Sequence, residues 1–401
     1  MNDGSLSLAH LLQPIAVESF LDRYYERESL VIQRDSPSHY DGLLSLGEID
    51  EIISATSLTS DDIVVVDHAR EIQPEDYLRD SLTPDPVRIH KLFDEGATIT
   101  LRQLQHRVPA LARLCRSVEQ EFSCSFQTNL YITPANAQGF ETHHDTHDVF
   151  ILQLSGSKRW QTYAPVMELP LTGQRYYWST PPGDPAKVFT LHPGDLFYCP
   201  RGTPHDAHAA REASVHISLG ALVSTWAELL LELVADVALR DAAFRASLPR
   251  DFARHEIAAE ILETTLRDLY SRLRSQARPR HILDLMADRF ISDHPALLSG
   301  QGSTLRAAAS LTLDSTVRVR AGLIHRLAGR RGRITLICNA RKITLPDFCA
   351  SSLRFALAGP PFRIRDLPGA MTESGKIALV RRLMQEGALV SEESMHTAPG
   401  G

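Results

Sequence analysis

Long apolar runs, paired cysteines and a leader pattern are all absent from this sequence. No apolar stretch approaches the roughly 20 residues that a membrane-spanning helix needs, so we expect no membrane segment. The first residues include Asp3 and lack the basic and then apolar pattern of a secretory leader, which leads us to expect a cytoplasmic protein. The five cysteines show no CxxC spacing, so neither a zinc site nor a disulfide framework is indicated.

The sequence does contain enough apolar material for ordinary folded domains. Its 401 residues are 43% hydrophobic, which favours two to three domains with buried cores. Charge is divided unevenly, because residues 311–401 hold 14 Lys and Arg against 7 Asp and Glu, a net charge of +7. Subtraction from the chain totals of 42 and 49 leaves 28 and 42, a net charge of −14, for residues 1–310. The basic C-terminal part is a candidate surface for nucleic acid or an acidic partner, with a solvated Arg-rich face as the simpler alternative.

The clearest chemical signal is a histidine and an aspartate two residues apart, His143 and Asp145. In an extended segment the side chains at positions i and i+2 point the same way, so these two can face one ion. A third ligand is offered by His205, which follows the apolar run 196–199 and a turn-forming Pro-Arg-Gly. Two histidines and one carboxylate, with three positions left open, form the facial triad of non-haem Fe(II) oxygenases. The sequence therefore predicts an iron site.

A second His-x-Asp pair, His39 and Asp41, shows that the tripeptide alone is weak evidence. It lies between a Ser-Pro-Ser turn and a glycine, and no strand pattern carries it, so we predict no metal there. The predicted iron site has a different context, since a glycine precedes its pair and the mostly apolar run 149–154 follows. His147 is on the same strand face as His143 and Asp145 and could also reach the metal. A fourth protein ligand would, however, occupy a coordination position that dioxygen or the cosubstrate needs. We therefore predict a supporting or substrate-side role for His147.

Four sequence blocks carry a resemblance to a known family. The chain resembles the JmjC-type, 2-oxoglutarate-dependent ribosomal oxygenases, which are protein hydroxylases on a double-stranded β-helix, or cupin, core. The segment 20–32 and the C-terminal third also follow the pattern of that family. The four blocks are Asn129-Leu130-Tyr131-Ile132-Thr133-Pro134, His143-x-Asp145, Leu154-x-Gly156-x-Lys158-x-Trp160, and Pro193-Gly194-Asp195 with Pro200-Arg201-Gly202-Thr203-x-His205.

The resemblance implies a role for each site residue. His143, Asp145 and His205 would bind Fe(II), while 2-oxoglutarate would take two further positions and leave the last for dioxygen. Lys158 would anchor the distal carboxylate of 2-oxoglutarate through a charge-assisted hydrogen bond. Three further residues are expected to contact this cosubstrate, with a core aromatic role as the alternative for the tyrosine: Asn129, Tyr131 and Ser218.

The periodicity and the resemblance together predict an α+β chain in three parts. Residues 1–222 are expected to form the JmjC/cupin catalytic domain with N-terminal helical bracing. Residues 223–310 switch to helical periodicity and form the dimerisation region of the resembled family, with an intrachain helical subdomain as the alternative. Residues 311–401 are expected to form a basic winged-helix domain. Its expected elements are helices over 319–327, 347–358 and 373–386 and a hairpin over 334–345.

These predictions describe a homodimeric Fe(II)- and 2-oxoglutarate-dependent dioxygenase that hydroxylates a side chain, His or Arg, in a protein or peptide. The resemblance makes a ribosomal protein one candidate substrate but does not fix the substrate, and Lys158 resembles the anchor of the histidyl-hydroxylating branch. Alternatives within the enzyme class are demethylation of N-methyl-lysine or N-methyl-arginine and hydroxylation of a peptide natural product. A basic winged-helix regulator with a ligand-sensing cupin is the non-enzymatic alternative, and the intact triad and anchor argue against it.

Overall fold

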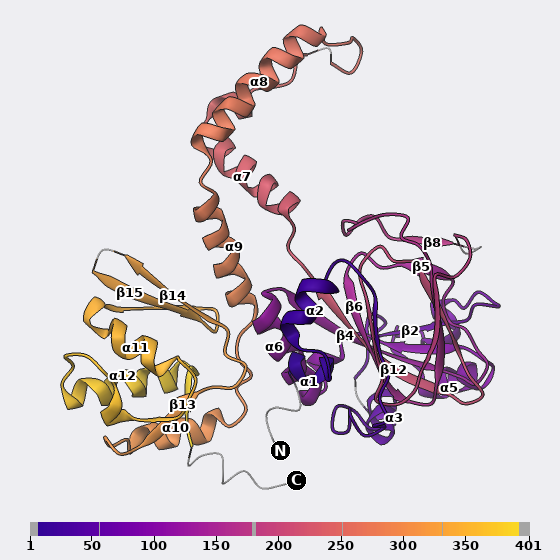
Figure 1. Cartoon of the computed structure of the whole chain (residues 1–401), viewed down its shortest axis with the longest axis horizontal. Coiled ribbons are helices and arrows are strands. Elements are labelled where there is room, and N and C mark those ends of the chain that lie inside the picture. The colour runs from indigo at the N-terminus through magenta and orange to yellow at the C-terminus, as the bar shows by residue number, and fades with distance from the viewer. Residues whose placement is uncertain (1–6, 56, 179–181, 251, 331, 393–401) are drawn as a thin grey trace. The chain divides into compact units, whose positions relative to one another are not determined.

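A computed structural model of the chain describes residues 7–55, 57–178, 182–250, 252–330 and 332–392. The chain separates into two compact units, Met1–Val223 and Ser224–Gly401 (Figure 1). Within the described residues, no helix is long and apolar enough to cross a membrane. The predicted domain limits at residues 222 and 310 stay predictions.

The first unit is built on two antiparallel sheets. The larger sheet has seven strands in the order β1-β10-β6-β12-β4-β3-β2, and the smaller has five in the order β8-β5-β11-β7-β9. Many neighbouring strands are far apart in the sequence, as in the double-stranded β-helix that the resemblance predicted. The larger sheet contains β1 (Leu30–Ile32), β2 (Ile63–Val66), β3 (Thr98–Leu101), β4 (Ser125–Thr133), β6 (Asp148–Ser155), β10 (Leu196–Cys199) and β12 (Ser214–Leu222). The smaller contains β5 (Thr142–His144), β7 (Lys158–Thr162), β8 (Tyr176–Trp178), β9 (Lys187–Leu191) and β11 (His205–Ala209).

The two faces of the larger sheet have different neighbours. Side chains alternate between the faces of a strand, so Leu130 of β4 points to the side opposite Asn129 and Tyr131. Leu130 belongs to the apolar core of the unit, with Phe150 of β6 and Tyr198 of β10. The other face lines a cavity. One face of the sheet therefore holds the unit together, and the other is available for a ligand.

Among the described residues, six α-helices complete the first unit, and all of them precede β4 in the chain. Phe20 of α2 is fully buried, and its ring lies 4.8 Å from that of Tyr198 between centroids. An ionic network also ties this region to the barrel, because Arg201 pairs with Glu26 at 2.6 Å and with Asp148 at 2.8 Å. Phe20 and Glu26 thus connect α2 and the turn after it to the barrel, and bracing by the other helices stays a prediction. The six α-helices are α1 (Leu8–Leu12), α2 (Val17–Arg23), α3 (Leu46–Ala55), α4 (Pro74–Tyr77), α5 (Pro86–Asp94) and α6 (Pro109–Phe122).

Two glycines shape the loops that lead to β10 and β11. Gly194, in the Pro-Gly-Asp turn, has a φ of +93°, and a Cβ there would lie 2.1 Å from the carbonyl oxygen of Ser36. Gly202 has a φ of +84°, and a Cβ there would lie 2.1 Å from the carbonyl oxygen of Met167. Only glycine fits both the left-handed backbone and the close approach. The turn at Gly202 delivers the chain into β11, which begins with His205.

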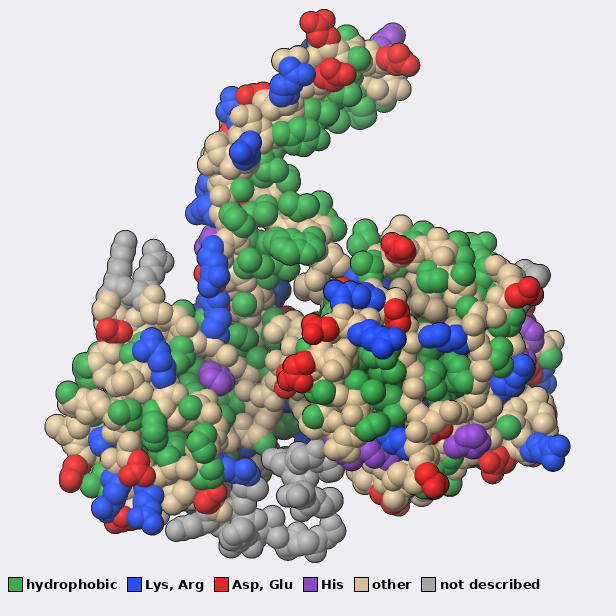
Figure 2. Space-filling model, viewed as in Figure 1, with side chains coloured by type: hydrophobic (Ala, Val, Ile, Leu, Met, Phe, Trp, Pro, Cys, Tyr) green, Lys and Arg blue, Asp and Glu red, His purple; other side chains and the backbone are tan. Residues whose placement is uncertain are grey.

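The second unit begins with long helices that bury little of their surface. α8 has no buried side chain, and α7 buries only Leu229, Leu233 and Val237. The space-filling view shows apolar side chains gathered along one side of these two helices (Figure 2). The helical periodicity predicted after residue 223 is thus present. The helices are α7 (Trp226–Arg240), α8 (Ala259–Gln276), α9 (Pro279–Asp293) and α10 (Gln301–Ala309).

In the described residues after α10, the second unit combines two small sheets with two α-helices. The predicted hairpin is present, and the predicted helices over 347–358 and 373–386 correspond to α11 and α12. Gly387 follows α12 with a φ of +75°, in the expected capping role. The elements are β13 (Thr316–Val319), β14 (His325–Arg330), β15 (Arg333–Cys338), β16 (Arg341–Pro346), α11 (Ala350–Ala356), β17 (Phe362–Arg363), α12 (Glu373–Gln385) and β18 (Leu389–Ser391). The sheets are β17-β13-β18 and β14-β15-β16.

The helix predicted over 319–327 is wrong. The chain there leaves β13, turns at Gly322 with a φ of +71° and enters β14. Apolar residues at 319, 323 and 327 fit a helical repeat, but short apolar patterns do not separate helix from strand. The segment is extended because β13 pairs with β18 and β14 pairs with β15.

Candidate metal centre

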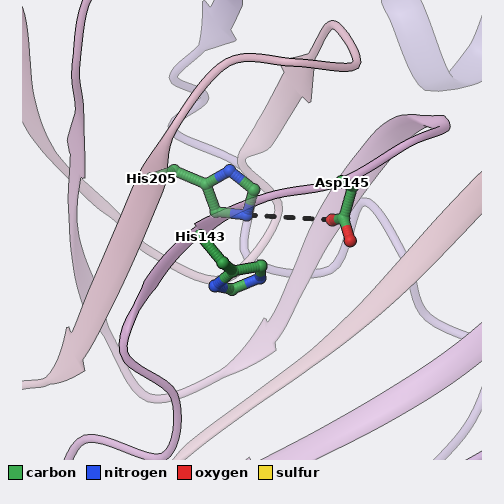
Figure 3. Close-up of side chains that lie close together, drawn as sticks. All are labelled: His143, Asp145 and His205. Atoms are coloured by element: carbon green, nitrogen blue, oxygen red, sulfur yellow. Dashed lines mark ion pairs between the residues drawn. The ribbon is translucent and has the colours of Figure 1, made fainter. Parts of the chain in front are cut away.

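Three side chains that the sequence singled out lie together in the first unit (Figure 3). His143 is in β5, Asp145 follows that strand, and His205 begins β11. The two strands are neighbours, and their register places His205 opposite His143. One ligand atom from each residue lies within 4.8 Å of the other two. Among the residues that the structure describes, no other group of three His, Cys, Asp or Glu meets this condition.

Hydrogen bonds to the backbone leave one nitrogen of each imidazole free for a metal ion. Nδ1 of His143 lies 2.8 Å from the carbonyl oxygen of Glu141, and Nδ1 of His205 lies 3.0 Å from that of Thr203. A carbonyl only accepts hydrogen bonds, so each Nδ1 carries the proton and each Nε2 offers its lone pair. Nε2 of His205 lies 3.9 Å from Oδ2 of Asp145, along the dashed line in Figure 3.

The protonation states at neutral pH suit a divalent cation. Burial and, secondarily, the nearby His205 lower the pKa of His143 to about 4. Burial alone would raise the pKa of Asp145, but His143, His147 and His205 outweigh it and lower that pKa to about 2. A neutral imidazole and an ionised carboxylate are the forms that bind metal ions.

The three side chains open into a cavity of about 410 Å³ that Lys158 of β7 also lines. Lys158 is buried, and its ammonium nitrogen donates to Oγ1 of Thr133 at 3.0 Å. Burial lowers the pKa of Lys158 to about 7, and no carboxylate of the described residues forms an ion pair with it. A buried amine without a counter-ion is costly, so this end of the cavity fits a carboxylate of a ligand.

The other predicted cosubstrate contacts line the same cavity. Ser218 of β12 lies opposite Asn129 of β4, and His216 lies opposite Tyr131. The side-chain oxygen of Asn129 accepts a hydrogen bond from the backbone N–H of Gln103 at 3.1 Å, which leaves its amide N–H groups for a ligand. The Tyr131 ring stacks on His216 with a centroid distance of 4.8 Å. Contact of these side chains with 2-oxoglutarate stays a prediction.

Arg175 is a residue of this site that the sequence did not indicate. Its Nη2 donates to Oδ1 of Asp145 at 2.8 Å, across 30 positions of sequence. β8 follows directly, pairs with β5 and brings the Tyr177 ring to a centroid distance of 5.3 Å from that of His143. The Tyr-Tyr-Trp sequence of β8 is typical of a strand, but no local pattern shows that this strand pairs with β5.

Two further histidines are outside the group of three. His147 lines the cavity and packs against Gly220, where a Cβ would lie 2.5 Å from Cδ2 of its ring. His39 stacks on His10 with a centroid distance of 4.1 Å, and its Nε2 lies 3.1 Å from the carbonyl oxygen of His10. Among the described residues, His39 and Asp41 belong to no group of three metal-ligating side chains, and the absence of a metal there stays a prediction.

Comparison with known proteins agrees with this geometry. The profile of the JmjC domain matches residues 100–229. Ribosomal oxygenase 2 from Bos taurus is 32% identical over 335 residues, which cover 77% of this chain and 70% of the bovine protein. The chain belongs to the JmjC ribosomal oxygenase family. As a family member it is a 2-oxoglutarate-dependent dioxygenase, and the residues of the cavity fit Fe(II) and 2-oxoglutarate.

Two other ribosomal oxygenase relatives extend the comparison. The bifunctional lysine-specific demethylase and histidyl-hydroxylase NO66 from Aedes aegypti is 30% identical over 342 residues, which cover 79% of this chain. The chain spans 53% of that protein, about half of its length. The ribosomal oxygenase YcfD from Escherichia coli, solved with cobalt and 2-oxoglutarate, has the same fold, with a TM-score of 0.56 and 17% identity. That match covers 94% of this chain and 99% of YcfD.

Proposed function

We propose that His143, Asp145 and His205 bind Fe(II), that Lys158 anchors 2-oxoglutarate, and that the enzyme hydroxylates a histidine side chain of a ribosomal protein. The observation that carries this proposal is the buried, unpaired Lys158 in the same cavity as the three metal-ligating side chains. A cytoplasmic location would suit such a substrate.

The protein side chains have separate tasks in this reaction. When bound, Fe(II) with 2-oxoglutarate and dioxygen supplies an oxidant that replaces a C–H hydrogen by hydroxyl, as 2-oxoglutarate becomes succinate and CO2. The two imidazoles present Nε2 to the metal because their Nδ1 atoms are held by backbone carbonyls. The Lys158 ammonium group orients the distal carboxylate, and its buried position keeps water from competing with that contact.

Charge in the cavity favours histidine over arginine as the target. Lys158, Arg102 and Arg175 all line it, and Arg175 alone of the three has a carboxylate partner among the described residues. Bound 2-oxoglutarate would neutralise Lys158, which leaves the Arg102 cation near any entering side chain. A neutral imidazole enters such a site at lower electrostatic cost than a guanidinium or a methylated ammonium group. The name of the NO66 relative includes histidyl-hydroxylase, which supports histidine over arginine, and also lysine-specific demethylase, which keeps demethylation as the alternative.

The proposal is tested by aerobic incubation of the enzyme with Fe(II), 2-oxoglutarate and ribosomal protein digests, followed by mass spectrometry. We expect one added oxygen on a histidine-containing peptide. An added oxygen on arginine peptides would change the target residue, and loss of a methyl group would favour the demethylase alternative. A small peptide natural product stays the alternative if ribosomal digests are unmodified while 2-oxoglutarate is still consumed. The His205→Ala variant is the control and should give no product.

We further propose that α7 and α8 form a homodimer interface. Large apolar side chains are exposed on these helices, including Trp226 (80% exposed), Leu231 (70%) and Tyr270 (66%). A soluble protein rarely leaves a contiguous apolar face of this kind uncovered, and a second copy presents the same self-complementary surface. Leu231→Glu and Tyr270→Glu should sediment as monomers. Leu82→Glu, at an equally exposed leucine of the first unit (66%), is the matched control and should leave the dimer intact.

For residues 311–401 we propose a winged-helix domain that orients a protein substrate, with nucleic acid as a secondary candidate partner. The three-stranded sheet β14-β15-β16 and the two helices α11 and α12 support the fold, although the helix predicted before the hairpin is replaced by strands. Several of its cations already have acidic partners: Arg326 and Lys342 pair with Asp288, and Arg382 pairs with Glu386. Paired cations attract phosphate groups less, so the +7 charge overstates the surface available to nucleic acid.

A further inference from the structure

The segment 174–178 is attached to the metal-binding strand along its whole length. The carbonyl oxygen of Gln174 lies 2.7 Å from Nε2 of His144, and the strand pairing places Tyr177 opposite His143. Between these contacts, Arg175 donates to Asp145. A segment joined to two of the three metal-ligating residues is well placed to fix their geometry.

The two oxygens of Asp145 have different neighbours. Oδ1 accepts the 2.8 Å hydrogen bond from Nη2 of Arg175, whereas Oδ2 is the oxygen that lies 3.9 Å from Nε2 of His205. Nε2 of His205 is also the nitrogen available to a metal, as its Nδ1 is engaged by the Thr203 carbonyl. One oxygen is therefore held by the guanidinium, and the other faces the ligand nitrogen.

We propose that Arg175 is a positioning residue that holds Oδ1 of Asp145, so that this carboxylate presents only Oδ2 to the metal. The inference rests on the proposed function of the triad. Its importance follows from counting positions around a six-coordinate ion. Two histidines and one carboxylate oxygen leave three positions, as the facial triad requires, whereas a bidentate carboxylate would leave only two. Two positions accommodate 2-oxoglutarate and exclude dioxygen.

A competing effect of Arg175 has the opposite sign. A guanidinium near a divalent cation repels it, and removing that charge would strengthen metal binding. The Arg175 side chain is 46% exposed, so solvent and salt screen this repulsion. Residues that orient a metal ligand through a hydrogen bond typically contribute 10–100-fold to metal affinity. We therefore expect the orienting effect to dominate.

Direct metal binding tests this role without depending on turnover. Mn(II) is titrated into the metal-free, full-length protein, and free Mn(II) is followed by electron paramagnetic resonance. Arg175→Met should bind Mn(II) about 10–100-fold more weakly than the wild type. Arg175→Gln should recover part of the loss, because an amide still donates to Oδ1 but carries no charge. Arg211→Met removes an exposed arginine outside the cavity and should not change the affinity.

The outcomes separate this inference from the proposed function. If the wild type binds no Mn(II) and His205→Ala is indistinguishable from it, the metal centre is wrong, and the role of Arg175 fails with it. If the wild type binds Mn(II) and Arg175→Met binds it equally or more tightly, the positioning role alone is overturned. Circular dichroism of each variant reports folding, and Arg175→Gln carries the test if Arg175→Met is unfolded. A further readout is the charge-transfer absorption of Fe(II) with 2-oxoglutarate under anaerobic conditions, which should shift in Arg175→Met.

Discussion

Lys158 in the first unit and Arg326 in the second are both cations held in folded structure, but their partners differ. Lys158 is buried and has only the hydroxyl of Thr133 as a hydrogen-bond partner among the described residues. Arg326 donates to Asp284 at 2.6 Å and to Asp288 at 2.7 Å, two carboxylates of α9. The Arg326 charge is satisfied within the protein, whereas that of Lys158 is not.

The difference indicates that the fold is destabilised by the buried Lys158 charge at a position where a ligand can bind. Burial lowers the pKa of Lys158 to about 7, so the fold holds the amine in a position that disfavours its charge. Arg326 is part of a network in which every charge has an opposite neighbour, which is the expected arrangement for a structural role. Removing Lys158 should therefore impair ligand binding while stabilising the fold, and removing Arg326 should destabilise the fold while leaving ligand binding unchanged.

The largest effect should come from the metal-ligating residues of the same cavity. His143→Ala and His205→Ala should each abolish Fe(II)-dependent turnover of 2-oxoglutarate, because two remaining ligands hold the metal poorly. Succinate formation is the measurement. His39→Ala, in the decoy pair, should be fully active. Substantial turnover by either triad variant would contradict the metal assignment.

Lys158→Ala should raise the KM for 2-oxoglutarate roughly ten- to a hundredfold, since a charge-assisted hydrogen bond contributes about 1.5–3 kcal/mol. The Fe(II) requirement should change much less. Steady-state kinetics with each component varied in turn separates the two, and Lys158→Arg should retain part of the affinity. An unchanged KM in Lys158→Ala would show that another cation, such as Arg159, anchors the cosubstrate.

Lys158→Met should stabilise the ligand-free protein near pH 6.5, because it removes a buried charge. Each unit by which burial lowers the pKa of Lys158 corresponds to about 1.4 kcal/mol of lost stability, so we expect a gain of roughly 2 kcal/mol or more. The folded-state pKa of Lys158, about 7, is below the unfolded value, so the unfolded chain binds more protons between pH 7 and about 10. The wild type should therefore gain stability as pH rises from 7 to 9, and Lys158→Met should lack this part of the gain. Urea unfolding at pH 6.5 and 9 measures both. A variant less stable than the wild type at pH 6.5 would show that the buried amine is compensated.

Arg326→Gln should lower the free energy of unfolding by about 1 kcal/mol, the scale of a partly exposed ion pair, with turnover of 2-oxoglutarate unchanged. The effect should shrink at high salt, because screening weakens the pair in the wild type. A double-mutant cycle with Asp288→Asn isolates the pair. A loss of turnover in Arg326→Gln would contradict the contrast between a structural Arg326 and a ligand-binding Lys158, since it would connect this ion pair to catalysis.

The grouping of His143, Asp145 and His205 could be predicted because the signals in the sequence are local. The spacing of His143 and Asp145 places them on one face of an extended segment, and the apolar run before His205 predicts a strand followed by a turn. Gly194 and Gly202 likewise occupy turns that their residue type requires. The position of Lys158 in the cavity followed from a resemblance, since a lone lysine in a strand has no distinctive pattern.

The residues that escaped prediction depend on contacts between distant segments. Arg175 reaches Asp145 because β8 pairs with β5, and a loop arginine carries no sign of its partner. The network of Glu26, Asp148 and Arg201 joins three remote parts of the chain in the same way. The helix predicted over 319–327 is wrong because the apolar spacing of this segment fits both helix and strand, and only the pairing with later strands distinguishes them.

The edge strand β1 has a consequence for how the protein is made. Among the described strands, β1 pairs only with β10, whose residues 196–199 are about 166 positions further along the chain. During synthesis, the N-terminal helices and β1 leave the ribosome long before their partner exists, and their apolar side chains stay uncovered in the meantime. Closure of the barrel, and with it the grouping of His205 with His143 and Asp145, must therefore come after residue 205 is made, and until then the exposed apolar side chains favour aggregation of the nascent chain.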